Sequence, residues 1–190
     1  PTAIFIARRE RLSATATTFI QILASIPVTV VYPVFASQLA GQPELRAFLM
    51  TIAATQYYVF FQVYAGVKNI PKNELELTEL LGLKTLDRIR NVYMPRALPP
   101  LVTGCITAAG GAWNSLVVSE RLVLGDVVAE TDLPGLGKLL SLMTYGGNLV
   151  GSIVVITVMS SLIVLMNRLF WKRLYDVVIS RLKIQEEVEK

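Results

Sequence analysis

The chain has 190 residues, of which 53% are apolar and only 17% are charged, and its mean hydropathy is +0.54. A water-soluble domain of this size needs more charge to cover its surface, so the composition excludes an ordinary soluble fold. With no histidine and a single cysteine, Cys105, the chain cannot build a histidine-based catalytic triad or a usual zinc site. We therefore expect neither catalytic residues nor a metal.

Four long uncharged runs follow one another along the chain, and they cover residues 14–36, 47–67, 97–119 and 139–167. A helix of about 20 apolar residues crosses the roughly 30 Å hydrocarbon core of a bilayer. Lipid offers the backbone no hydrogen bonds, so each run should be helical. The sequence predicts an all-α fold, a polytopic transmembrane bundle with about four spans. The last run is too long for one span, and we expect it to bend at Gly146 and Gly147.

Two features mark the beginning of the chain. The apolar stretch 1–7 runs directly into Arg8 and Arg9, as the end of an earlier helix would. The first run then carries Pro27 and Pro33, and prolines are tolerated in membrane helices because neighbouring groups re-satisfy the freed backbone. We expect a structural kink here, with a kink that lines a pathway as the alternative.

The second run contains uncharged polar side chains, among them Gln56 and Tyr57. At membrane depth such groups bond to neighbouring helices or line a wet cavity, and packing between helices is the simpler interpretation. The third run shows small residues at intervals of four, beginning at Gly104, which let helices approach closely. It closes with Glu120, a position that is solvated unless it faces a cavity.

The segment 69–95 differs from an ordinary connection, which would be shorter and polar. Its leucines recur at helical spacing in two short pieces that Gly82 separates, and Pro71 with Asn73 marks the helix start. Such a segment is typical of a docking element or of an amphipathic helix on the lipid surface. The acidic side chains of the segment argue against the second interpretation, because the inner leaflet is anionic.

Two further segments complete the chain. Gly137-Lys138 has the spacing of a phosphate-binding loop in part, but Leu139 stands where serine or threonine is required, so we exclude that motif. The tail after residue 167 has apolar residues on one face and basic residues on the other, which predicts a short surface helix.

The net charge of +4 is unevenly distributed rather than gathered for nucleic acid. If the four runs are spans, fifteen lysines and arginines fall in residues 1–13, 67–96 and 168–190, and three fall in residues 37–46 and 120–138. The positive-inside rule then places both ends and the segment 67–96 in the cytoplasm.

The segment 69–95 resembles a known motif. It reads Glu76-Leu77-Thr78, then three residues, Gly82, nine residues, and a close ending in Pro95. This resembles the "EAA" loop of the permease subunits of binding-protein-dependent ABC importers, in which Glu-Ala-Ala is followed at the same spacings by Gly and by Ile-x-Leu-Pro. Leucine and threonine replace the two alanines, and Val92 and Met94 replace isoleucine and leucine.

The resemblance covers nearly the whole chain. Residues 20–33 resemble the "SIP" span of the nitrate, sulfonate, taurine and bicarbonate branch, and residues 95–104 resemble its entry to the next span. Residues 111–120 are similar to members with a duplicated permease, and Leu136-Gly137 is common there. We expect one transmembrane domain over 1–190, with the coupling loop at 69–95 inside it, lacking the first helix or helices of the family.

The resemblance implies a transport subunit in a prokaryotic plasma (inner) membrane, with several passes. Two permease subunits, or two halves of a fused one, would form the pathway for a small oxyanion such as nitrate, a sulfonate or taurine, or bicarbonate. An external solute-binding protein would deliver the solute, and two cytoplasmic ATPases would carry ATP and Mg, with no cofactor on this chain. ATPase docking is implied for Glu76, Glu79, Leu80, Leu81, Gly82, Leu83, Leu86 and Pro95. The pathway candidates are Gln56, Tyr57, Trp113, Asn114 and Ser115.

Simple physical arguments support that role for the loop. Gly82 can adopt a turn that a residue with a Cβ atom resists, and Pro95 should stop the loop helix and set the angle of the third span. A rigid connection of this kind would pass movement of an ATPase to the spans as a rigid-body movement.

Two other classes of protein also contain several membrane-spanning helices. A membrane-embedded enzyme would need carboxylates, histidines or a nucleophile at membrane depth. A secondary transporter would couple to ions through intramembrane carboxylates or unwound helices. The runs contain no charged residue, which favours a transport subunit that is not an enzyme. An ion-gradient-driven secondary transporter or another polytopic membrane protein is the alternative.

Overall fold

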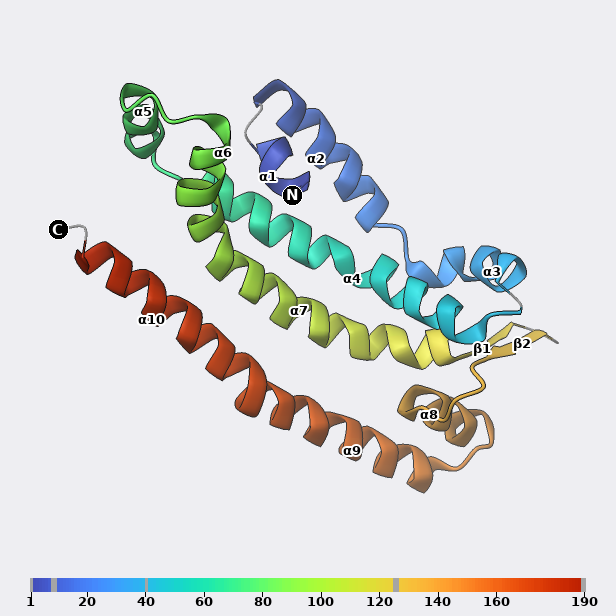
Figure 1. Ribbon diagram of the computed structural model, residues 1–190. Helices are drawn as coiled ribbons and strands as arrows, with labels where there is room; N and C mark the ends of the chain where they lie inside the picture. Colours follow the sequence, from blue (N-terminus) through green and yellow to red (C-terminus); the bar gives the residue numbers. More distant parts are fainter. Residues whose placement is uncertain (1, 8–9, 40, 125–126, 189–190) are drawn as a thin grey trace. The chain divides into compact units, whose positions relative to one another are not determined.

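The computed structural model describes residues 2–7, 10–39, 41–124 and 127–188. The chain divides into two compact units, and two long helices, α4 (Pro43–Lys68) and α7 (Met94–Glu120), contribute to both (Figure 1). Unit 1 comprises residues 1–21, 58–107 and 168–190, and unit 2 comprises residues 22–57 and 108–167. Arg8, Arg9 and Lys190, which enter the comparison of charges, lie outside the described residues.

The described chain is almost entirely helical, as predicted for the all-α class. The remaining helices are α1 (Thr2–Ala7), α2 (Glu10–Ala24), α3 (Val28–Gln38), α5 (Lys72–Leu80), α6 (Thr85–Arg88), α8 (Leu136–Tyr145), α9 (Leu149–Met166) and α10 (Lys172–Val188), with π-helical turns η1 (Ile89–Tyr93) and η2 (Asn167–Trp171). One element was not predicted from the sequence. It is an antiparallel hairpin of β1 (Arg121–Leu124) and β2 (Val127–Glu130), in which Arg121 lies opposite Glu130.

Fewer helices qualify as spans than the four uncharged runs predict. Among the described residues, two helices are long and apolar enough to cross a membrane, Thr85–Glu120 and Leu149–Ser180, and the bent pair formed by α2 and α3 would make a third. Helix α4 has 26 residues, which is long enough, but its glutamines, threonines and tyrosines make it less apolar. The count of four spans therefore stays a prediction.

The first run is broken rather than merely kinked. Helix α2 ends at Ala24, α3 begins at Val28, and the two are bent by 76°. Pro27 precedes the first residue of α3, where a proline is tolerated because that N–H has no partner in the helix. Pro33 lies inside α3 without ending it.

Two predicted helix ends proved wrong. Pro95 does not stop the loop helix, since α6, η1 and α7 form one continuous helix from Thr85 to Glu120. A π-helical turn widens the hydrogen-bond ladder just before the proline, so the chain can pass Pro95 without the usual break. The tail is likewise no separate surface helix, because α9, η2 and the first part of α10 run together as Leu149–Ser180.

In unit 1, α4 and α7 approach closely at two glycines. A Cβ atom on Gly66 would lie 2.2 Å from Cγ of Pro100, and one on Gly104 would lie 2.9 Å from Cα of Val59. Of the predicted stripe of small residues, Gly104 is confirmed as a point of close helix packing. Beside this crossing lies the apolar core of the unit, formed by Ala3, Ala7, Val63, Val67, Ile70, Tyr93 and Ala97.

In unit 2, α8 and α9 form a helical hairpin whose turn lies where the sequence predicts a bend. Gly147 has a φ of +70°, and the side chain of Asn148 accepts a hydrogen bond of 2.8 Å from the N–H of Gly151 at the start of α9. A left-handed residue followed by a capping asparagine ends one helix and starts the next.

Glu120 is neither simply solvated nor aimed into a cavity. Its carboxylate accepts a hydrogen bond of 2.8 Å from the backbone N–H of Lys138, in the first turn of α8. This satisfies a donor that no residue within the helix can satisfy, and a negative charge suits a helix N-terminus.

Candidate functional site

The segment between α4 and α7 folds as two short helices around a glycine turn. Helix α5 begins after Pro71, and α6 begins at Thr85. Between them Gly82 has a φ of +64°, with no atom within 4 Å of a Cβ built there. Glycine is needed here for its backbone conformation and not for space. The predicted division of the segment at Gly82 is confirmed.

Two ion pairs stabilise this turn, and neither was predicted from the sequence. Arg96 makes a bidentate pair with Glu74, with distances of 2.6 Å from Nη2 to Oε1 and 3.2 Å from Nε to Oε2. Arg88 pairs with Glu79, 3.1 Å from Nη1 to Oε1, and its Nε donates to the carbonyl oxygen of Leu83 at 3.0 Å. The first pair joins α5 to the start of α7, and the second joins α5 to α6.

Backbone bonds and apolar contacts complete the support. The N–H of Leu83 donates to the carbonyl oxygen of Thr78 at 3.1 Å, and the buried hydroxyl of Thr78 donates to Leu75. Leu75, Ile89 and Val92 pack against the core of unit 1. The segment is thus tied to the ends of α4 and α7, as a rigid connection requires.

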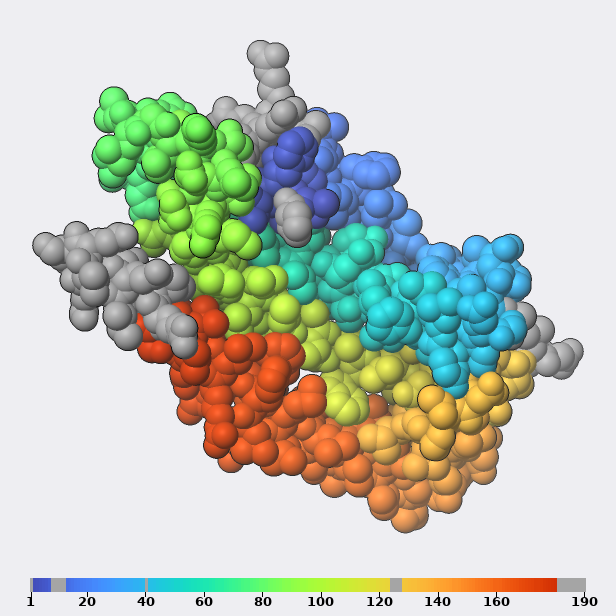
Figure 2. Space-filling view, viewed as in Figure 1, coloured from blue at the N-terminus to red at the C-terminus, as the bar shows by residue number. Residues whose placement is uncertain are grey.

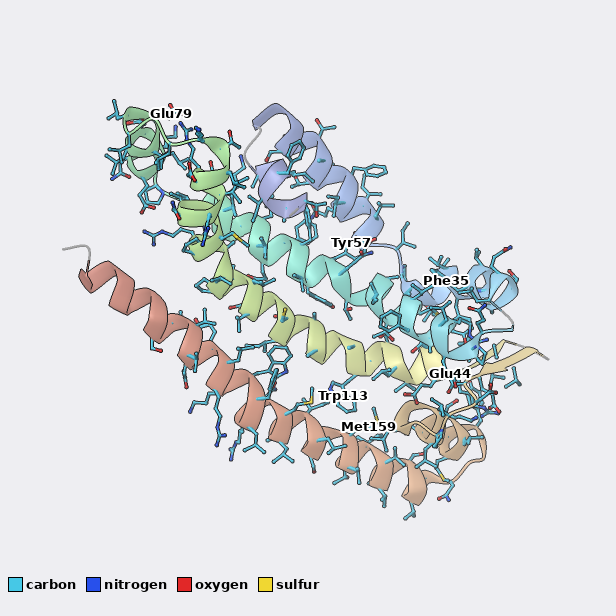
Figure 3. The ribbon with its side chains drawn as sticks, in the orientation of Figure 1. Phe35, Glu44, Tyr57, Glu79, Trp113 and Met159 are labelled. Atoms are coloured by element: carbon cyan, nitrogen blue, oxygen red, sulfur yellow. The ribbon has the colours of Figure 1, made fainter. Side chains whose placement is uncertain are left out.

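The outer face of the segment, whose residues are drawn in green in the space-filling view of Figure 2, carries exposed leucines. Leu80 is 85% exposed and Leu86 is 74% exposed, with Leu81 and Leu77 also exposed. Glu76 is exposed too, and within the described residues it makes no ion pair. We call Glu76, Leu77, Leu80, Leu81 and Leu86 the docking face. Figure 3 labels Glu79 on α5, the helix that supplies three of these five residues.

The other residues predicted to dock fall into two groups. Gly82 and Glu79 are exposed, although Glu79 is engaged by Arg88. Leu83 and Pro95 are half-buried, and Pro95 belongs to the first turn of α7. The residues predicted to dock are therefore exposed, except for Leu83 and Pro95, which are half-buried.

The five predicted pathway residues lie in unit 2 but are not gathered at one site. Of the five, Tyr57 alone lines an apolar pocket bounded by the end of α2, by α3 and by the middle of α4. Gln56 and Asn114 are exposed and Trp113 is half-buried, while Ser115 is buried with its hydroxyl donating to Ala112. Figure 3 shows Tyr57 on α4 and Trp113 on α7. No cluster of three or more metal-binding side chains occurs among the described residues.

Comparison with known proteins defines the family. The family described as "Binding-protein-dependent transport system inner membrane component" matches residues 1–176. The chain belongs to this family. It is therefore a membrane protein of the permease type found in ABC importers, and the resemblance of the sequence to this family is confirmed.

Individual relatives come from the sulfonate and nitrate branch. The chain is 26% identical over 113 residues to the putative aliphatic sulfonates transport permease SsuC of Escherichia coli (strain K12), and the match covers 60% of this chain and 41% of that protein. It is 27% identical over 105 residues to the nitrate import permease NrtB of Leptolyngbya laminosa, and this match covers 55% of this chain and 37% of that protein. The matches span about two fifths of the length of these curated relatives.

Proposed function

We propose that residues 1–190 form the transmembrane domain of a permease in an ATP-driven importer, with 69–95 as its coupling loop. The domain crosses the prokaryotic plasma membrane several times, has both ends in the cytoplasm, and forms the pathway for a small oxyanion such as nitrate, a sulfonate or taurine, or bicarbonate. A cytoplasmic ATPase binds the docking face and drives the transport.

The observation that carries this proposal is the docking face itself. Apolar side chains gathered on an exposed surface with a polar rim mark a protein interaction site. Here the apolar residues project from a turn that two ion pairs and a left-handed glycine hold in place. A surface of this kind can transmit a push from a partner, because it is joined firmly to α4 and α7.

The proposed division of labour follows from the family. The permease binds no cofactor of its own, and ATP with Mg is held by the ATPase. A second permease subunit, or the second half of a fused permease, completes the pathway, and an extracytoplasmic solute-binding protein supplies the oxyanion. The permease is then not an enzyme, because hydrolysis takes place on the separate ATPase.

The test is purification of the full-length protein from membranes in mild detergent, followed by identification of any co-purifying nucleotide-hydrolysing subunit. The test variant combines Glu76→Arg with Gly82→Leu, which reverses a charge on the docking face and strains the turn. The control is Asp132→Arg, the same kind of charge reversal at an exposed position of unit 2.

We expect the ATPase to co-purify with the parent and with Asp132→Arg, and to be lost from the double variant while membrane insertion is unchanged. Absence of an ATPase from the parent, or its retention by the double variant, would reject the proposal. Transport driven by an ion gradient would then be measured in its place.

A further inference from the structure

The helix Leu149–Ser180 changes character abruptly at the end of α9. Helix α9 has 18 residues and no charged side chain. Arg168, Lys172 and Arg173 then follow within six residues, and they are the only basic residues in 139–180. Eighteen residues of helix span about 27 Å, nearly the thickness of the hydrocarbon core. If α9 crosses that core, the three cations lie at the depth of the lipid headgroups.

Arg168, Lys172 and Arg173 form what we call the basic patch. All three side chains are exposed, and none of them forms an ion pair in the part of the chain that the structure describes. Asp176 lies one helical turn after Lys172 but does not pair with it. By contrast, Arg96 binds a carboxylate of α5. The charge of the basic patch is therefore open to an anion from outside the chain.

The π-helical turn η2 brings the basic patch together. The turn covers Asn167–Trp171, so it includes Arg168 and ends directly before Lys172. In an α-helix a residue five positions later lies well round the helix from the first, whereas a π turn closes on the fifth residue and brings it back. Lys172 and Arg173, four and five positions after Arg168, are therefore both drawn towards its side. Single π turns occur frequently at functional sites.

Aromatic side chains flank the basic patch. Phe170 is 54% exposed and Tyr175 is 38% exposed, while Trp171 is half-buried and meets Phe170 edge to face, with ring centres 4.9 Å apart. Aromatic rings gather at the level of the headgroups, and the long side chains of lysine and arginine extend to the same level from the end of a span. This combination favours a lipid headgroup over the surface of a soluble partner.

We propose that the basic patch binds the headgroup of an anionic phospholipid, with phosphatidylglycerol as the test ligand. The two arginines suit the phosphate because a guanidinium group can donate two parallel hydrogen bonds to it. Each cation near an anionic surface strengthens binding about fivefold. A zwitterionic lipid gains less, because its own ammonium group lies beside the phosphate and is repelled. The site goes beyond the proposed function, which enters only in assigning the lipid to the cytoplasmic leaflet.

The experiment uses the full-length permease in vesicles of phosphatidylcholine and phosphatidylglycerol, mixed in varied proportions. One of the two lipids carries bromine atoms on its acyl chains, which quench tryptophan fluorescence on contact. Each protein is measured with Trp171 and with Trp171→Phe, and the difference gives the quenching at Trp171 alone. The relative affinity of the two lipids for this place follows from the dependence of quenching on lipid composition.

The variants separate this site from a diffuse effect of net charge. The test variant combines Arg168→Gln, Lys172→Gln and Arg173→Gln. The control removes three other exposed basic side chains that make no ion pair in the described chain, and it combines Lys72→Gln, Lys84→Gln and Arg90→Gln. Both variants lose the same amount of charge. A charge-conserving variant combines Arg168→Lys with Arg173→Lys.

We expect the parent to prefer phosphatidylglycerol at least tenfold, because three cations act together. The test variant should prefer it less than about threefold, and the control should match the parent. The charge-conserving variant should keep a preference of at least about fivefold. If the test variant does not insert into the membrane, Arg173→Gln alone decides, with an expected loss of about fivefold.

Equal affinity of the two lipids for the parent would overturn the inference. Equal losses in the test variant and the control would do the same, because they would show a diffuse effect of net charge. A test variant that keeps the lipid preference but loses the co-purifying ATPase would reassign the basic patch to a protein partner. Absence of an ATPase from the parent rejects the proposed function and leaves the lipid preference as it is, so the two failures are distinguishable.

Discussion

Two polar regions of the molecule, one in each unit, are built in opposite ways. The segment 69–95 of unit 1 pairs its charges at the surface and leaves leucines exposed, with Leu80 at 85%. The region of unit 2 that includes the hairpin and the turn before α8 also has ion pairs at the surface, made by Glu130, but it turns other charges inward, and Arg46 is only 3% exposed.

The inward charges of unit 2 serve the backbone. Glu44 accepts hydrogen bonds from the N–H groups of Asp132 and Leu133 at 3.0 Å and 2.9 Å. Arg46 donates to the carbonyl oxygen of Glu130 at 2.9 Å and lies over the ring of Tyr32, 5.8 Å from its centre. Buried backbone groups outside helices need such partners. Oε2 of Glu44 and Nε of Arg46 are themselves buried without a hydrogen-bond partner among the described residues, so the region satisfies these backbone groups but not every buried side-chain atom.

The segment 69–95 of unit 1 differs, because it leaves apolar side chains exposed. Exposed apolar surface costs about 25 cal/mol for each Å² left in water, and four leucines bear that cost together. A polar connection between helices can therefore use its charges to satisfy backbone groups, or it can leave apolar side chains exposed for a partner protein. The direction in which charges and leucines point distinguishes the two.

The largest effect is expected from close packing in unit 2, at Gly137. A Cβ atom there would lie 2.7 Å from the carbonyl oxygen of Leu116 and from Cα of Val117, which are backbone atoms. Gly137→Ala should therefore destabilise the protein by about 1–3 kcal/mol, seen as a lower thermal unfolding midpoint in detergent. Gly110→Ala is the control, because a Cβ atom on Gly110 meets nothing within 4 Å. Equal midpoints for the two variants would contradict the close packing of α8 on α7.

The next effect concerns the docking face. Leu80→Asp combined with Leu81→Asp should lower the affinity for the ATPase at least tenfold, because loss of an interface hot spot costs about 2 kcal/mol or more. The unfolding midpoint should not fall, since both side chains are already exposed. The matched variant is Leu133→Asp, an exposed leucine of unit 2, which should bind the ATPase normally. Equal losses at the two places would remove the distinction between the regions.

Local chemistry explains what the sequence could predict. The glycine turn, the start of α5 and the leucine face depend on neighbours within a few residues, so their pattern is legible in the chain. The bend at Gly146 and Gly147 is of the same kind, and the structure confirms it through the left-handed Gly147.

Tertiary partners explain what it could not. The pair of Glu74 with Arg96 joins residues 22 apart, and the bond from Lys138 to Glu120 joins residues 18 apart. No local pattern distinguishes these charges from solvated ones. The same holds for Arg46, one of the three basic residues in segments 37–46 and 120–138. The passage of the helix through Pro95 was not predicted because it depends on the π-helical turn before the proline.

A smaller effect is expected from the turn itself. Gly82→Ala places a Cβ atom on a residue with a φ of +64°. The left-handed backbone conformation of the turn then becomes less favourable by about 1–2 kcal/mol. That cost should appear as weaker ATPase binding, up to about tenfold, because the turn relaxes away from its docking geometry. Gly41→Ala, where a Cβ atom is also unhindered and φ is not left-handed, is the control. Tight ATPase binding by Gly82→Ala would show that the docking face does not depend on this turn.

The smallest effect separates the two functions of Arg88. Glu79→Gln removes an ion pair whose acidic side chain is 68% exposed, and such pairs contribute only about 0.2–1 kcal/mol. Arg88→Gln removes in addition the bond from Nε to the carbonyl oxygen of Leu83, so it should weaken ATPase binding more than Glu79→Gln does. Arg121→Gln, which breaks the comparable pair with Glu130 in unit 2, should leave binding unchanged. If Glu79→Gln and Arg88→Gln prove equal, the pair alone holds the turn. If Arg121→Gln weakens ATPase binding as much as these two variants do, the loss of binding reflects a general loss of stability. The segment 69–95 and the hairpin region of unit 2 would then differ less than their geometry indicates.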